Sequence, residues 1–85
     1  MNINKELIIE ILKEKDYIIK SNTNESFIIK SKLGIEKIYK WEGILTLYSI
    51  FYEDSSSEED SIAYIIAVID SHLNFKDELK SAKNN

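Results

Sequence analysis

Two different spacings of hydrophobic residues mark out the structural elements of this chain. Near the start, apolar residues recur three and four positions apart, with charged residues between them. This spacing is typical of one face of an α-helix and predicts an amphipathic helix over residues 4–15. Asn2 or Asn4 can cap its first turn, because a short amide side chain accepts hydrogen bonds from free backbone N–H groups.

Shorter segments rich in β-branched and aromatic residues follow, and they predict three strands over residues 17–20, 27–31 and 35–41. The polar turn 21–25 and the turn 32–34 separate them, and Gly34 is free to adopt a positive φ there. Turns this short join neighbouring antiparallel strands, so we expect a three-stranded meander. The first helix is expected to cover one face of this sheet.

Residues 44–53 suit either a strand or a helix. Their β-branched and aromatic content favours a strand, but Ile44, Leu47, Tyr48 and Phe51 fit one helical face. We predict a helix and keep a fourth strand as the alternative. Residues 61–73 predict a last helix that is apolar more than halfway round. Such a helix is either largely buried or meets a partner with one side.

The predicted fold class is therefore α+β, with a helix, a three-stranded antiparallel sheet and two further helices (αβββαα). One compact domain is expected over residues 1–75, followed by a polar C-terminal tail over residues 76–85 that frays. We expect the core to include apolar residues from every element: Leu7, Ile11, Ile18, Phe27, Ile29, Ile38, Leu47, Phe51, Ile62, Ile66 and Ile69.

Composition removes several classes of chemistry. The chain has no cysteine and a single histidine, His72, so neither a disulfide nor a metal site is expected. The serines at 55–57 have no evident base nearby in sequence, so we predict no catalytic residue, no cofactor and no enzyme activity. A secretory signal needs an uncharged apolar run near the start of the chain, and charged residues interrupt that region here. The longest apolar run, 62–69, is far shorter than the roughly 20 residues of a membrane span. We expect a cytoplasmic protein that does not bind membranes.

Charge is unevenly distributed along the sequence. Residues 1–40 carry eight lysines and six acids, whereas residues 41–85 carry three lysines and nine acids. We expect residues 53–60 to form an acidic, serine-rich linker, in which five carboxylates occur with no lysine among them. This acidity argues against direct binding of nucleic acid and favours a basic protein partner. A structural explanation is also open, in which Ser57 caps the last helix and the acids that follow it complement the helix dipole.

Two parts of the chain resemble a small family of acidic phage and prophage anti-CRISPR proteins, which inhibit the RNA-guided DNA nuclease of type II systems. The resemblance is carried by Met1-Asn2-Ile3-Asn4, Leu7-Ile8, Glu10-Ile11, Lys15-Asp16-Tyr17 and Lys20, and further on by Tyr52-Glu53-Asp54 and Glu58-Glu59-Asp60. The order of elements in that family, one helix, three strands and two helices, is the order predicted above.

The resemblance implies a DNA mimic that occupies the arginines with which the nuclease reads duplex DNA. The implied partner-binding residues are acidic: Asp16, Glu36, Glu53, Asp54, Glu58, Glu59 and Asp60. The partner would be a CRISPR effector nuclease, with or without its guide RNA, and a monomer is favoured although a homodimer is open. The alternative is a structural or interaction protein of a mobile element that associates with itself through the last helix and has no nuclease target.

Overall fold

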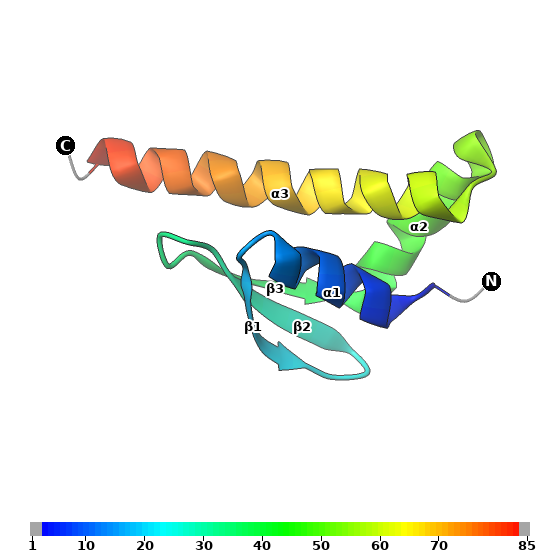
Figure 1. Ribbon diagram of the computed structural model, residues 1–85, viewed down its shortest axis with the longest axis horizontal. Helices are drawn as coiled ribbons and strands as arrows, with labels where there is room; N and C mark the ends of the chain where they lie inside the picture. The colour runs from blue at the N-terminus through cyan, green and yellow to red at the C-terminus, as the bar shows by residue number, and fades with distance from the viewer. Residues whose placement is uncertain (1–2, 84–85) are drawn as a thin grey trace.

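The chain folds into the predicted order of one helix, three strands and two helices (Figure 1). A computed structural model describes residues 3–83. The elements are α1 (Lys5–Glu14), β1 (Ile18–Asn22), β2 (Ser26–Lys30), β3 (Glu36–Lys40), α2 (Trp41–Ser55) and α3 (Glu58–Lys83). The fold class α+β is confirmed, and the ambiguous segment 44–53 is helical, so the alternative of a fourth strand was wrong. None of the helices within the described residues is long and apolar enough to cross a membrane.

The sheet is an antiparallel meander in the order β1-β2-β3. Gly34 adopts a φ of 88° in the turn between β2 and β3, as the sequence predicted. The register of β1 shifts between Ile19 and Ser21, which places an irregularity in the edge strand. In the pairing of β2 with β3, Phe27 lies opposite Tyr39 and Ile28 lies opposite Ile38. Neighbouring residues of a strand point to opposite faces, so the two pairs lie on different sides of the sheet.

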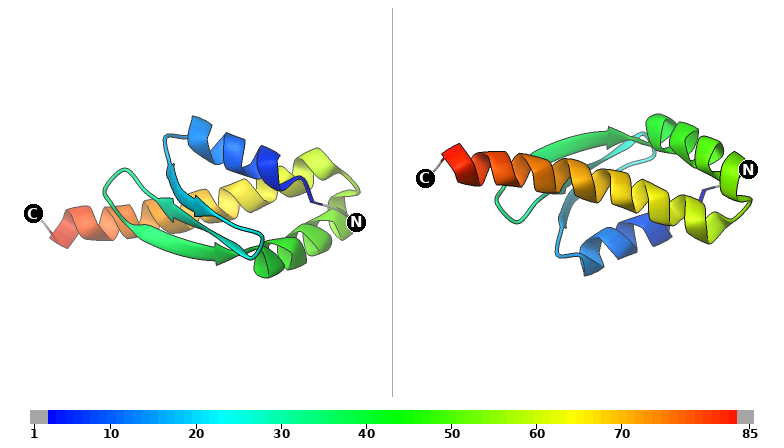
Figure 2. Two further views of the ribbon diagram at one scale, coloured as in Figure 1. Left: turned by 90° about the horizontal axis from the view of Figure 1, so that it is seen from below. Right: turned by 90° about the horizontal axis from the view of Figure 1, so that it is seen from above.

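The long helix α3 covers one face of the sheet, and α1 and α2 lie on either side of α3 when the molecule is seen from above (Figure 2). Polar side chains connect α3 to the sheet side. The Ser31 hydroxyl donates a hydrogen bond to the Asp77 carboxylate at 2.5 Å, and the Tyr39 hydroxyl lies 3.0 Å from the Nδ1 of His72. The sequence assigned this cover to the first helix, whose contacts lie instead with β1 and α3.

Two of the three helices, α1 and α3, begin with the cap that the sequence offered. The side chain of Asn4 accepts a hydrogen bond from the Leu7 backbone N–H at 3.1 Å. The hydroxyl of Ser57 accepts one from the Asp60 N–H at 3.2 Å. Each bond satisfies a donor that has no partner inside the first helical turn. Asn2, the other cap candidate for α1, lies outside the described residues.

The core prediction was right for the inner positions of β2 and for α3, and wrong in phase elsewhere. Phe27, Ile29, Ile62, Ile66 and Ile69 are buried. Ile11, Leu47 and Phe51 are only partly buried, and Leu7, Ile18 and Ile38 are exposed. The side chains that replace them inside are Ile8, Ile9, Leu12, Tyr17, Trp41, Ile44, Tyr48, Ile65 and Leu73.

Packing accounts for the phase errors in α1 and at Ile38. In α1, either Leu7 and Ile11 or Ile8 and Leu12 can form an apolar stripe, and packing turns the second pair inward. In the sheet, α3 covers the face that carries Phe27 and its cross-strand partner, so Ile38 falls on the uncovered face. The sequence contains apolar residues for both choices, and only the neighbours decide between them.

Helix α3 runs ten residues beyond its predicted end at Leu73. Residues 76–83, predicted as a polar tail outside the domain, are helical. Contacts with the turn between β2 and β3 hold this extension, because Asp77 accepts the Ser31 hydrogen bond and the Lys80 ammonium donates to the Leu33 carbonyl. Residues 84–85 of the predicted tail lie outside the described residues.

Candidate functional site

The corner where α2 meets α3 carries the densest negative charge in the sequence. Residues 53–60 were predicted as an acidic linker, but most of them are helical and only Ser56 and Ser57 connect the two helices. Ser56 adopts the left-handed conformation with a φ of 54°, and its N–H bonds to the Tyr52 carbonyl at 2.7 Å. The chain therefore reverses direction in a tight corner, and acids from both helix ends gather around it.

Serine hydroxyls hold this corner together. Ser55 accepts a hydrogen bond from the Ser57 N–H at 3.3 Å, and the buried Ser61 hydroxyl donates to the Ser57 carbonyl at 2.7 Å. These serines make local bonds to backbone groups, which is the ordinary role of serine at a helix boundary. The geometry thus gives them a structural task and leaves the carboxylates as the groups that face outward.

All five carboxylates of the corner are exposed: Glu53, Asp54, Glu58, Glu59 and Asp60. None of them lies within ion-pair distance of a lysine in the part of the chain that the structure describes. Other acids of the same molecule are paired. Asp70 lies 3.9 Å from the Lys15 ammonium, and Glu36 lies 2.6 Å from that of Lys20. Glu6, Glu10 and Glu14 of α1 also lack an ion pair within residues 3–83, but lysines lie among them in the sequence, whereas the corner collects five carboxylates within eight residues and no lysine.

Helix capping accounts for only part of the corner. Glu58, Glu59 and Asp60 lie in the first turn of α3, where negative charge complements the positive end of the helix dipole. Glu53 and Asp54 lie in the last turn of α2, at the negative end of that helix. Carboxylates there are unfavourable by about 0.3–1 kcal/mol each. Helix-dipole stabilisation therefore does not explain these two residues.

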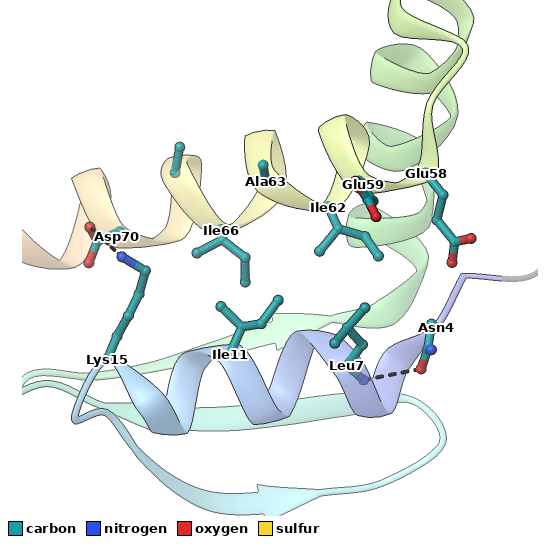
Figure 3. Close-up of a pocket in the computed structure, with 11 residues that line it drawn as sticks. Asn4, Leu7, Ile11, Lys15, Glu58, Glu59, Ile62, Ala63, Ile66 and Asp70 are labelled. Atoms are coloured by element: carbon teal, nitrogen blue, oxygen red, sulfur yellow. Dashed lines mark hydrogen bonds and ion pairs between the residues drawn. The ribbon is translucent and has the colours of Figure 1, made fainter.

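An apolar groove between α1 and α3 begins beside the corner (Figure 3). Its volume is about 700 Å³. Leu7 and Ile11 reach up from α1 toward Ile62 and Ile66 of α3, as Figure 3 shows. Glu58 and Glu59 line one end of the groove, and the Lys15–Asp70 pair lies at the other. The arrangement joins a hydrophobic floor to a rim of free carboxylates, a combination typical of protein interfaces.

At the far end of the groove, the acidic side chain that lines it already has partners within the molecule. The hydroxyl of buried Tyr17 donates a hydrogen bond to Asp70, which also faces the Lys15 ammonium. Burial, and after it the hydrogen bond to Asp70, raises the pKa of Tyr17 above its ordinary value. Asp70 is thus already occupied within the molecule, so Glu58 and Glu59 are the acids of the groove that remain available to a partner.

The structure divides the seven predicted site residues into two groups. Five lie at the α2–α3 corner, whereas Asp16 lies in the turn after α1 and Glu36 is the first residue of β3. Asp16 has a φ of 69° and lies 3.8 Å from the Lys32 ammonium. The hydrogen bond from Lys20, followed by its charge, lowers the pKa of Glu36. Both distant acids have lysine partners, so the geometry does not join them to the corner.

Sequence reasoning did not identify the groove. It placed Leu7 and Ile11 in the core, where their spacing suited a buried face. The sequence feature that could have indicated the groove is the excess of apolar residues in α1, which has more of them than one narrow stripe can bury. Among residues 3–83 there is also no cluster of three or more acidic, histidine or cysteine side chains placed to hold a metal ion.

No protein-family model, no curated protein and no solved structure matches this chain.

Proposed function

We propose that this protein is an inhibitor that binds a basic surface of a protein partner and excludes the nucleic acid for which that surface is built. The single observation that carries the proposal is the set of five exposed carboxylates gathered at the α2–α3 corner, with no lysine among them and no lysine partner among the described residues. Unpaired carboxylates match the charge of phosphates and bind arginine in the same geometry. Inhibition by occupancy requires no chemistry.

The groove supports a protein partner over a small ion. Its apolar floor, with Leu7 and Ile62 facing each other across it, offers a place for a hydrophobic side chain of the partner. Glu58 and Glu59, at one end of the groove, would then pair with cationic residues of the partner that lie beside that side chain. A contact that combines a buried apolar anchor with a charged rim is stronger and more selective than charge alone.

The proposed partner is the effector nuclease of a type II CRISPR system, within a bacterial cytoplasm. The resemblance of residues 1–20 and 52–60 to anti-CRISPR inhibitors supports this choice, and the αβββαα fold is in keeping with it. Such a nuclease reads its short duplex motif with arginines in the major groove. The acidic corner would occupy those arginines before target DNA is bound, so we expect it to compete with the duplex motif.

The test replaces Asp54, Glu58 and Glu59 by Asn, Gln and Gln. Charge-assisted bonds to arginine contribute about 1.5–3 kcal/mol each when they are desolvated. Loss of one such bond weakens binding at least about tenfold. Affinity for the nuclease–guide complex and competition with target DNA are measured for the natural protein and the variant. The natural protein is expected to bind and compete, with an association rate that falls as salt rises.

A matched control replaces three exposed acids of α1, namely Glu6, Glu10 and Glu14, by glutamine. It changes the net charge by the same amount but leaves the corner intact, so we expect close to natural affinity. Equal weakening in both variants would show that net charge alone matters. Unchanged binding by the corner variant, together with a lower melting temperature, would reduce the carboxylates to helix caps. Failure of the natural protein to bind any nuclease–guide complex would overturn the proposed target.

A further inference from the structure

Helix α3 carries a second apolar stripe that the fold leaves uncovered. Tyr64, Val68, Phe75 and Leu79 are 43–60% exposed. Their spacing of four, seven and four residues keeps them within one narrow sector of a helix with 3.6 residues per turn. The buried residues of α3, such as Ile65 and Ile69, occupy another sector. In the view from above, α3 lies over the other elements and is open along its length (Figure 2).

The four side chains of the stripe expose more apolar surface in one place than the isolated apolar residues that are common on protein surfaces. Two of its four members are aromatic, and within residues 3–83 Tyr64 has a close aromatic neighbour, the Phe51 ring of α2 at 5.1 Å between centroids, whereas Phe75 has none. Contiguous exposed apolar surface of this kind marks an interface, because leaving it in water forgoes its burial. The stripe runs along one helix, so its shape suits a second helix.

We propose that the occupant is a second copy of this chain, packed antiparallel along α3 about a twofold axis between Ser71 and His72. The order of the stripe matches itself in reverse. Tyr64 and Leu79 are equally far from that midpoint, as are Val68 and Phe75. An antiparallel pair therefore sets Tyr64 against Leu79 of the other copy and Val68 against its Phe75. A twofold interface requires this self-complementarity, and an unrelated partner would not.

The residue near the axis permits close approach. Ser71 is small and exposed, so two helices can meet there at the short end of the usual 8–10 Å interaxial distance. The stripe covers 16 residues, or about 24 Å of helix. With aromatic side chains of about 150–250 Å² each roughly half exposed, the four rings of a dimer contribute about 300–550 Å² of buried area. Val68, Leu79 and flanking residues add to this area, and the total stays at or below the low end of specific interfaces, at roughly 1,200 Å².

An interface of that size corresponds to a weak dimer, with a dissociation constant on the order of micromolar. In dilute solution the chain would be a monomer, as favoured by the sequence. The inference rests on the stripe and not on the proposed target. Because Glu58 and Glu59 line the groove on the α1 side of α3, self-association leaves them free for a different partner.

Cysteine cross-linking tests the position of the axis, and the chain has no natural cysteine to interfere. A disulfide forms only when the two Cα atoms approach to about 4.4–6.8 Å. The variant Ser71→Cys is expected to become a covalent dimer under mild oxidation. Ser49→Cys is the matched control, since Ser49 is also an exposed helical serine but lies on α2, and it should remain largely uncross-linked. Equal cross-linking of both variants would overturn the proposed axis.

Charge substitution tests the pairing of residues. Sedimentation is measured from roughly a tenth of the expected micromolar dissociation constant to roughly a hundred times that value, so that the range brackets it. The pair Val68→Glu and Phe75→Glu in one chain, or the corresponding pair of lysines, should abolish the dimer. Mixing the two variants should restore it as a heterodimer. Ile50→Glu, at an exposed apolar residue of α2, should leave the natural dimer intact.

A monomer at every concentration of the natural chain would overturn the proposal. So would a dimer that survives the double glutamate variant, or a mixture of the two double variants that stays monomeric while each keeps its fold by circular dichroism. Binding of the nuclease–guide complex by the double variants is measured separately, so failure of self-association and failure of the proposed target are distinguishable.

Discussion

Two leucines of α1 provide a direct test of how this helix is packed. Leu7 and Leu12 carry the same side chain on the same helix, but Leu12 is fully buried and Leu7 is 37% exposed at the groove. The sequence pattern placed Leu7 in the core and did not name Leu12. Replacing each by alanine therefore compares the structure with the sequence-based expectation, with helix propensity changed equally in the two variants.

The expected magnitudes differ because only one substitution creates a closed cavity. Leu12→Ala removes fully buried methyl groups, and a core Leu→Ala change costs about 2–5 kcal/mol. Leu7→Ala removes partly buried atoms beside an open groove that water can enter. Since full burial of leucine contributes about 1.5–3 kcal/mol, its partial loss should cost roughly 1–2 kcal/mol. We expect the Leu12 variant to lose more stability by about 2 kcal/mol.

Urea denaturation followed by circular dichroism measures the free energy of unfolding of both variants. In a domain of this size each 1 kcal/mol corresponds to about 4–8 °C in melting temperature, so the two should also separate clearly in a thermal scan. If Leu12→Ala is too unstable to measure, Leu12→Val, which removes one methylene and should cost about 1 kcal/mol, takes its place. A Leu7 variant as destabilised as the Leu12 variant, or more so, would show that the packing of α1 described above is wrong.

Two further substitutions test local features. Burial, and after it the charges of Lys76 and Lys37, lowers the pKa of His72 from 6.5. As pH falls, the imidazole is therefore protonated in the unfolded chain before it is protonated in the folded one, so the free energy of unfolding should decrease below about pH 6.5. His72→Gln should remove that part of the drop in urea denaturation between about pH 7 and 5, and an identical drop in both proteins would contradict the assignment. Ser56→Gly relieves a left-handed residue with φ 54° and should raise stability by up to about 1 kcal/mol in thermal melts, whereas a lower melting temperature would contradict it.

Local patterns were sufficient to predict the kind and order of the elements. Asn4 and Ser57 mark helix starts because their side chains can satisfy backbone donors within three residues, whatever the rest of the fold does. Gly34 marks a turn because a positive φ is strained for other residues. The acidic cluster at 53–60 could also be read directly, since neighbours in sequence remain neighbours in space.

The tertiary structure decided which face of each element is buried and which acids share a surface. Several elements are apolar on more than one side, so composition alone did not choose between Leu7 and Leu12, or between the two faces of the strand that holds Ile38. Distance in space placed Glu36 beside Lys20 and away from the α2–α3 corner. The stripe that ends at Leu79 depends on α3 continuing past Leu73, and contacts with the turn between β2 and β3 hold that extension. Local signals determine elements because they act over a few residues, whereas burial and partnership depend on neighbours that only the assembled chain supplies.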